Sequence, residues 1–463
     1  MPRRPPPETA MTDAAPPGPW GPRSAAAAMA AAEQAQLQRS AATSVPRVAP
    51  AAATTPVAFT GLAGELLGLL VKGYLLQVVT LGIYRFWFIT DVRRYYWSHS
   101  FVGREGIAYT GRGIELLKGF LIALAILVPI QAASFFVLLG LPQAEFVVSA
   151  VVFVLYLLLG QFAVYAGRRY RLTRTSFRGL RLRMTGSAWS YAFKAFGLWL
   201  LVILSLGLAF PWAAAIMERL KMRQTWYGDA QGDFVGTAGD LMKRGILIWL
   251  LAFGLPALMI GSVLLSIPPR VWSDLFAAVG DGTVSRQSAT GLAIAALTGA
   301  GIISVVIPIL LFPAFSAVVY RWRMNGTRIG GAALASSFTI GSSYRVYILG
   351  CIALLGILLL VAVAGAILFG GLAAAIFARG NLDFESPATG ITGIAVLALA
   401  YILVIGTLWI AKQLVIDLRL QRARLASLSV LNLSALDGVT ANNVDASAMG
   451  DSLGDAVDFG FGA

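Results

Sequence analysis

Long uninterrupted apolar segments dominate the middle of the chain. They cover, approximately, residues 65–88, 115–141, 146–166, 191–216, 245–266, 291–319, 346–377 and 390–411. A helix of ~20 apolar residues spans the hydrocarbon core of a bilayer, where only helices and closed barrels satisfy their own backbone groups. Because the segments are continuous rather than alternating, they predict an all-α fold, that of a polytopic helical membrane protein.

The charges that flank these segments argue against eight simple crossings. Arginines lie on both sides of segments 65–88 and 191–216, although basic residues normally stay on the cytoplasmic side of a membrane. If these two segments enter the membrane and return, every Arg-rich connection becomes cytoplasmic. We therefore expect about six full crossings plus two re-entrant or half-inserted hairpins, with both termini on the cytoplasmic side of a bacterial inner membrane. Eight crossings remain the alternative.

A shift of 125 residues brings two parts of the chain into register without a gap. The matched residues include Gly61 with Gly186, Trp87 with Trp212, Arg94 with Arg219, Gly103 with Gly228 and Lys118 with Lys243. The glycines after Thr80-Leu81 and Ser205-Leu206 permit a break in each hairpin segment. The expected organisation is a disordered Ala/Pro-rich tail (1–56), two membrane repeats (57–181 and 182–320), a C-terminal membrane segment (321–430) and an acidic tail (431–463).

The composition agrees with a membrane protein and excludes several classes of site. Only 13% of the residues are charged, against about 25% in a soluble protein. The net charge of +14 comes from arginines beside apolar segments, which indicates anionic lipids at the cytoplasmic face rather than nucleic acid as a partner. The single cysteine and single histidine exclude Cys-based and multi-His metal sites. We expect no catalytic site and no cofactor, while a homo-oligomer is compatible with the sequence.

Polar residues within or beside the apolar segments are candidates for a polar path or a substrate site, because such residues are costly in lipid. The candidates are Lys72, Gln77, Glu115, Lys118, Gln131, Asp240 and Lys243. The simpler interpretation of Glu115 and Lys118 is an interfacial ion pair at a helix start. For Lys72 the alternative is a side chain that extends to the interface.

A short motif occurs four times after apolar segments: an Arg, a hydroxyl residue six positions later, and a Gly three or four positions after that. The copies are Arg94/Ser100/Gly103, Arg169/Thr175/Gly179, Arg219/Thr225/Gly228 and Arg321/Thr327/Gly330. Together these groups could bind a lipid headgroup phosphate. The favoured alternative is that the Arg anchors a helix end and the Gly caps it.

Several stretches carry a family resemblance. The chain resembles the YjgN-like family of uncharacterised bacterial inner-membrane proteins at residues 80–87 (TLGIYRFW), 93–95, 109–111, 168–175 (RRYRLTRT), 186–189 and 450–456 (GDSLGDA). The resemblance extends from Phe59 to the C-terminus and implies a multi-pass membrane protein of unknown function. It supplies no catalytic or ligand residues.

Two functions from different classes are consistent with these patterns. Broken apolar segments and internal repeats favour a transporter or channel-like protein for an unidentified solute. The repeated Arg/hydroxyl/Gly motif favours a lipid-binding or membrane-organising scaffold without catalysis. A membrane enzyme ranks third, because no P-loop, HExxH, GxSxG or dinucleotide motif occurs in the sequence.

Overall fold

The computed structural model describes residues 53–272, 288–378 and 387–441. Residues Ala53–Ala463 belong to one compact unit. Most of the expected disordered tail (1–56), most of the expected acidic tail (431–463) and the family-like stretch 450–456 lie outside the described residues. Strand β1 begins at Thr54, within the range expected to be disordered.

Ten short strands close into an antiparallel barrel, so the all-α prediction is wrong. The strands follow one another around the barrel in chain order, and β1 pairs with β10 to close it. They are β1 Thr54–Phe59, β2 Ser100–Val102, β3 Glu105–Tyr109, β4 Thr175–Phe177, β5 Leu180–Met184, β6 Thr225–Tyr227, β7 Ala230–Phe234, β8 Thr327–Ile329, β9 Ala332–Ser336 and β10 Leu428–Leu431. Strands of three to six residues are too short for a clear alternating pattern.

Four two-residue turns form the hairpins of the barrel. Such turns need positive φ at one or both central residues. Gly103 has φ 63°, Gly228 has φ 56° and Gly330 has φ 54°. The β4–β5 hairpin turns at Arg178 and Gly179, with φ 50° and 78°. The glycine in each copy of the Arg/hydroxyl/Gly motif is therefore a hairpin residue and not a helix cap.

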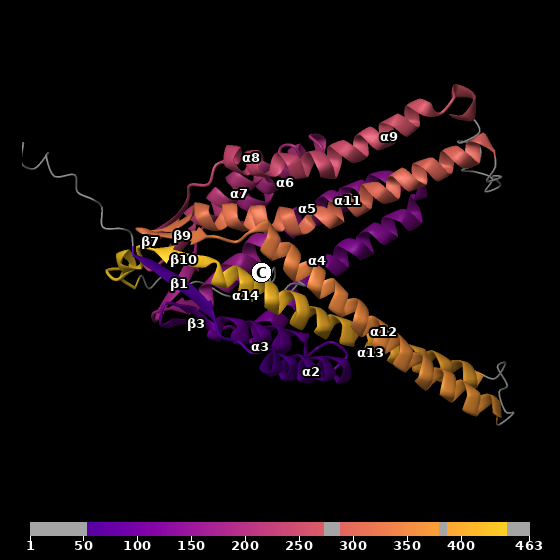
Figure 1. The fold of residues 1–463 in the computed structure, drawn as a ribbon, viewed down its shortest axis with the longest axis horizontal. Coiled ribbons are helices and arrows are strands. Elements are labelled where there is room, and N and C mark those ends of the chain that lie inside the picture. The colour runs from indigo at the N-terminus through magenta and orange to yellow at the C-terminus, as the bar shows by residue number, and fades with distance from the viewer. Residues whose placement is uncertain (1–52, 273–287, 379–386, 442–463) are drawn as a thin grey trace, which may run out of the picture. The chain divides into compact units, whose positions relative to one another are not determined.

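Five helix pairs connect the strands, and each pair leaves the barrel after one strand and returns to the next (Figure 1). The first three pairs are α2 Ala63–Val79 with α3 Arg85–Ser98, α4 Gly113–Gly140 with α5 Glu145–Thr173, and α6 Ala188–Leu204 with α7 Phe210–Arg223. In the fourth pair, α8 Ala238–Trp249 continues through a π-helical turn into α9 Leu255–Ser266, and α11 Ala289–Gly326 returns. The fifth consists of α12 Ile340–Ala378 and α13 Pro387–Lys412, the latter continuing through a π-helical turn into α14 Leu418–Ala426.

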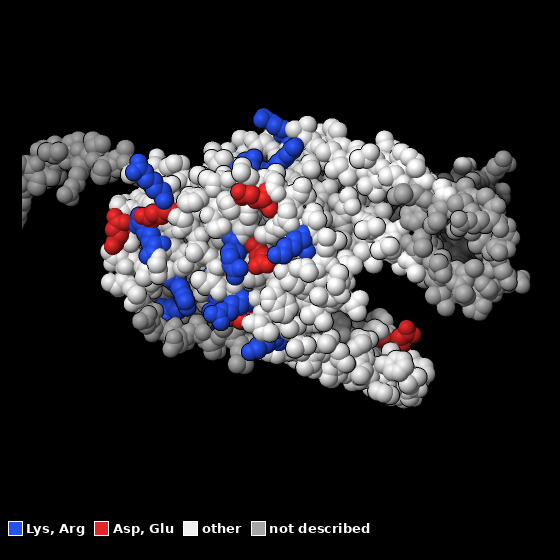
Figure 2. Space-filling model, turned by 90° about the horizontal axis from the view of Figure 1, so that it is seen from below, with Lys and Arg blue, Asp and Glu red and all other residues white. Residues whose placement is uncertain are grey.

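Six helical segments among the described residues are long and apolar enough to cross a bilayer. They are Gly113–Gly140, Pro142–Thr173, Ala238–Ser266, Ala289–Gly326, Ile340–Ile367 and Ala398–Ala426. In one view of the surface, Lys and Arg lie over the barrel and the helix ends next to it, and none is seen over the far part of the long helices (Figure 2). Because no soluble fold needs such exposed apolar helices, the protein is a membrane protein.

The first and fourth apolar segments of the sequence each form a helical hairpin. The chain reverses at Leu81-Gly82, with φ 51° and 91°, and at Leu206-Gly207, with φ 50° and 85°. Thr80 Oγ1 accepts a 2.9 Å hydrogen bond from the backbone N–H of Tyr84, and Ser205 Oγ accepts an equivalent bond from Ala209. These hydroxyls hold the turn that the positive-φ residues permit.

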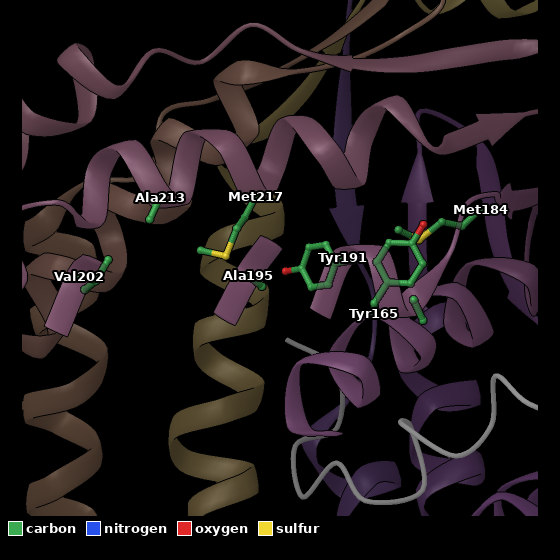
Figure 3. Packing of buried hydrophobic residues seen from close by; sticks show 8 residues of the cluster. Tyr165, Met184, Tyr191, Ala195, Val202, Ala213 and Met217 are labelled. Carbon is green, nitrogen blue, oxygen red and sulfur yellow. The ribbon is translucent and has the colours of Figure 1, made fainter. Parts of the chain in front are cut away.

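Buried side chains between helices and strands fix the second helical hairpin, α6 and α7, against the barrel. Tyr165 of α5 packs beside Met184 of β5 and Tyr191 of α6, and Met217 of α7 extends the same cluster (Figure 3). The rings of Tyr165 and Tyr191 lie 5.0 Å apart, centroid to centroid. The helix ends and the barrel therefore share one core.

The segment after β10 crosses the turn end of the barrel. Asn432 donates to the backbone oxygen of Gly331, Asp437 accepts a 2.6 Å bond from Arg178, and Thr440 bonds to Asp229. These three partners lie in the turns of three different hairpins. Strand β1 and residues 432–441 therefore lie at the barrel and not among the long helices.

Candidate functional site

Five helices run directly into the barrel: α3, α5, α7, α11 and α14. The strand register makes positions in these helices comparable, because the first residue of each following strand pairs with the last residue of the strand before it. The pairs are Ser100 with Phe59, Thr175 with Tyr109, Thr225 with Met184, Thr327 with Phe234 and Leu428 with Ser336.

Counting back seven and four residues from these strand starts selects two positions on one helical face. The first position holds Arg93, Arg168, Glu218, Tyr320 and Gln421, and the second holds Tyr96, Arg171, Lys221, Arg323 and Arg424. Six of these ten residues are cationic and one is acidic. Arg93 is completely buried, so this face combines strong positive charge with low access to water.

Glu218 is the centre of an ionic group that joins three helices. Its side chain accepts a 2.7 Å bond from Lys221 Nζ, one turn further along α7. Arg323 Nε of α11 lies 3.1 Å from the same carboxylate oxygen. From α5, Arg168 reaches α7, where its Nη2 lies 3.3 Å from Met222 Sδ. We call Arg168, Glu218, Lys221 and Arg323 the junction cluster.

Burial and charge together shift the two titrating groups of the junction cluster. Burial alone raises the pKa of Glu218, but Lys221, Arg323 and Arg168 outweigh it, so this pKa lies below the ordinary value. Burial lowers the pKa of Lys221 to about 8, and attraction to Glu218 offsets only part of that effect. Near neutral pH the junction cluster therefore holds three cations against one carboxylate.

Several polar atoms on this face have no hydrogen-bond partner among the described residues. They include Arg168 Nε, Arg424 Nε and the Tyr96 hydroxyl. An unsatisfied buried donor costs about 1–3 kcal/mol. The side chain of Arg323 is 45% exposed, which leaves the junction cluster accessible from one side. Its excess charge and free donors suit an anion, whereas no three His, Cys, Asp or Glu side chains come together in the described segments as metal ligands would.

The four-copy motif has contacts of its own with the backbone. Each hydroxyl donates to the carbonyl four residues earlier, in bonds of 2.7–2.9 Å made by Ser100, Thr175, Thr225 and Thr327. Arg94 and Arg169 donate to the backbone oxygens of Gly111 and Gly186, and Arg219 lies 3.5 Å from that of Phe234. Arg321 occupies the same position in α11 and is half-buried. The motif thus forms a helix-to-hairpin connection, and its binding of headgroups stays a prediction.

Most of the other candidate residues lie apart from one another in the structure. Glu115 of α4 pairs with Arg174 of α5 at 2.8 Å, and Gln131 accepts a 2.9 Å bond from Tyr156, so both join α4 to α5. Asp240 bonds to Thr237 at the start of α8. Lys118 and Lys243 are exposed, and Gln77 is half-buried. Lys72 and Arg94, in contrast, line one pocket between α2 and α3.

Sequence reasoning missed the junction cluster because basic residues beside the apolar segments were interpreted only as charges that flank membrane helices. One signal was present: the 125-residue shift places Glu218 opposite Arg93. The two copies of the repeat therefore differ in charge at this position, which singles out Glu218 among the basic residues around it. The structure brings Glu218 to the centre of the ionic group.

The model of a family described as "Bacterial protein of unknown function (DUF898)" matches residues 54–456. No curated protein matches the chain. No solved structure matches it either.

Proposed function

The chain belongs to the DUF898 family of bacterial proteins of unknown function, and we propose that it is a transporter or channel-like protein of the inner membrane for an anionic solute. The match confirms the resemblance to the YjgN-like family. Because the family has no known activity, the proposal rests on this chain's own residues.

The observation that carries the proposal is the excess positive charge of the junction cluster. Ionisable side chains that are buried inside a membrane protein are expensive and commonly mark the path of a solute or ion. One carboxylate, that of Glu218, faces the three cations Lys221, Arg323 and Arg168, so the junction cluster keeps a net positive charge that an anion could neutralise. Arg168 and Arg323 lie at the barrel ends of two membrane helices, where a passing anion would meet them.

The alternative function, a lipid-binding scaffold, rested on the Arg/hydroxyl/Gly motif. The backbone contacts of Arg94, Arg169 and the four hydroxyls supply a structural reason for that motif. The motif therefore favours a scaffold no more than a transporter.

Flux measurements test the proposal. Purified protein in liposomes should pass chloride or inorganic phosphate, and Lys221→Gln should reduce the flux severalfold. The flux of the unchanged protein should fall as pH rises through about 8, because Lys221 then loses its proton. Glu218, whose pKa lies below its ordinary value, stays ionised over this range. The step near pH 8 should therefore be absent in Lys221→Gln.

The matched control for this experiment is Arg223→Gln. Arg223 lies on the same helix as Lys221, but its side chain is 65% exposed and pairs only loosely with Asp233, at 3.6 Å. Its replacement should leave the flux unchanged. Folded protein that passes neither anion above the level of empty liposomes would contradict the proposed function.

We further propose that the barrel and both termini lie on the cytoplasmic side. In a background without Cys351, we expect a membrane-impermeant thiol reagent to label Gln143→Cys, between α4 and α5, on intact cells. It should label Arg104→Cys, in the β2–β3 turn, only after lysis. Both positions are exposed, so access to the side chain does not distinguish them. The reverse labelling pattern would refute this orientation.

A further inference from the structure

A pocket of about 470 Å³ lies between α2 and α3, the two helices of the first helical hairpin. Lys72 from α2 and Arg94 from α3 line it, together with Tyr84, Asp91 and Ser98. We propose that this pocket binds a phosphate group, with Lys72 and Arg94 as its cationic ligands. The inference is independent of the proposed transport function, because it involves none of the residues of the junction cluster.

Lys72 is available for a ligand. It is exposed, and it forms no ion pair or hydrogen bond with any residue in the described part of the chain. Arg94 keeps free donors as well: its 3.2 Å pair with Asp91 is exposed, and its bond to Gly111 is long, at 3.4 Å. A guanidinium carries five N–H donors, so an anion can bind beside both contacts.

The second helical hairpin, α6 and α7, serves as an internal comparison. At a shift of 125 residues, Gly197 stands for Lys72, Ala209 for Tyr84 and Ile216 for Asp91. The second hairpin nevertheless turns with the same backbone conformation. The fold of a hairpin therefore does not require these polar groups, and their presence in the first one needs a different explanation.

Two sources of phosphate fit this position. The α2 surface exposes Leu67, Val71 and Leu75, which favours contact with acyl chains beside the pocket, as in a phospholipid. A free phosphate would use the same two cations without the apolar surface. Both sources share one requirement: the positive charge of Lys72.

Binding to the full-length protein in detergent distinguishes these sources. Native mass spectrometry would follow retention of a short-chain phosphatidylglycerol, with and without excess inorganic phosphate. Lys72→Gln should weaken binding about tenfold, the effect of losing one charge-assisted contact. Lys194→Gln is the matched control, since Lys194 is an exposed lysine on helix α6 of the other helical hairpin. Thermal unfolding of both variants would establish that they are folded.

Each outcome decides the proposal. Lipid retention that depends on Lys72 and resists inorganic phosphate identifies a lipid headgroup site. Loss of the lipid to inorganic phosphate, with direct phosphate binding that depends on Lys72, identifies a site for free phosphate. Absence of binding by both probes, or equal loss in Lys72→Gln and Lys194→Gln, overturns the proposal. A failed flux experiment would leave this result unaffected.

Discussion

Glu218→Gln should lower the free energy of unfolding by about 3–5 kcal/mol, the usual effect of removing one partner from a buried ion pair. Glu218 is only 3% exposed, and its carboxylate contacts Lys221 and Arg323. The substitution keeps the size of the side chain, so the loss comes from charge. Without the carboxylate, cations from three helices would repel one another in a desolvated place. Guanidinium unfolding of the detergent-solubilised protein would measure the change.

The matched control for Glu218→Gln is Asp233→Asn. Asp233 also pairs with an arginine, but its side chain is 53% exposed and the pair is 3.6 Å apart. An exposed pair contributes about 0–1 kcal/mol, so the control should unfold almost like the unchanged protein. Equal effects of the two substitutions would mean that Glu218 is no more critical than a surface carboxylate.

Gly236→Val should destabilise the barrel by about 1–3 kcal/mol or more, as is typical of overpacking a core. A Cβ at residue 236 would lie 2.5 Å from Phe234 Cζ and 3.2 Å from Trp322 Nε1. Phe234 is 1% exposed and Trp322 is 4% exposed, so neither ring has space to move. Trp322 also donates a 2.9 Å bond to the backbone oxygen of Thr237, which the displaced ring would break. The thermal midpoint of the solubilised protein would report the loss.

Gly239→Ala provides the comparison for this second substitution. It lies three residues further on, in α8, and a Cβ there meets no atom within 4 Å. Alanine favours a helix by about 1 kcal/mol over glycine, so this variant should be neutral or slightly more stable. A decrease as large as that of Gly236→Val would show that the effect is not caused by the contact with Phe234.

The parts of the fold that long patterns encode could be predicted from the sequence, and the short ones could not. Apolar runs of more than ~18 residues are specific to membrane helices, and the breaks at Gly82 and Gly207 were visible as glycines. The strands were hidden because Ser100–Val102 and the other strands that follow helices have only three or four residues and follow those helices without a loop. A hydroxyl residue and a Gly just after a helix are as typical of a helix end as of a short hairpin.

The candidate site was less accessible to sequence reasoning than the fold. Lys72 and Arg94 were both identified, but nothing in the sequence places them in one pocket. Glu218 and Arg323 are 105 positions apart in the chain and meet only because the barrel arranges α7 beside α11. Spacing along a chain cannot reveal a contact that depends on the closure of a sheet whose strands were not foreseen.

The pairing of β1 with β10 determines when the barrel can close during synthesis of the chain. Thr54 pairs with Leu431, so the first strand leaves the ribosome long before its partner exists. The membrane helices, whose apolar runs insert one after another, can be in place while the barrel is still an open sheet with β1 and β9 as free edges. The barrel therefore cannot close until residues 428–431 have been made, and a chain released before residue 428 would keep both edges exposed to self-association.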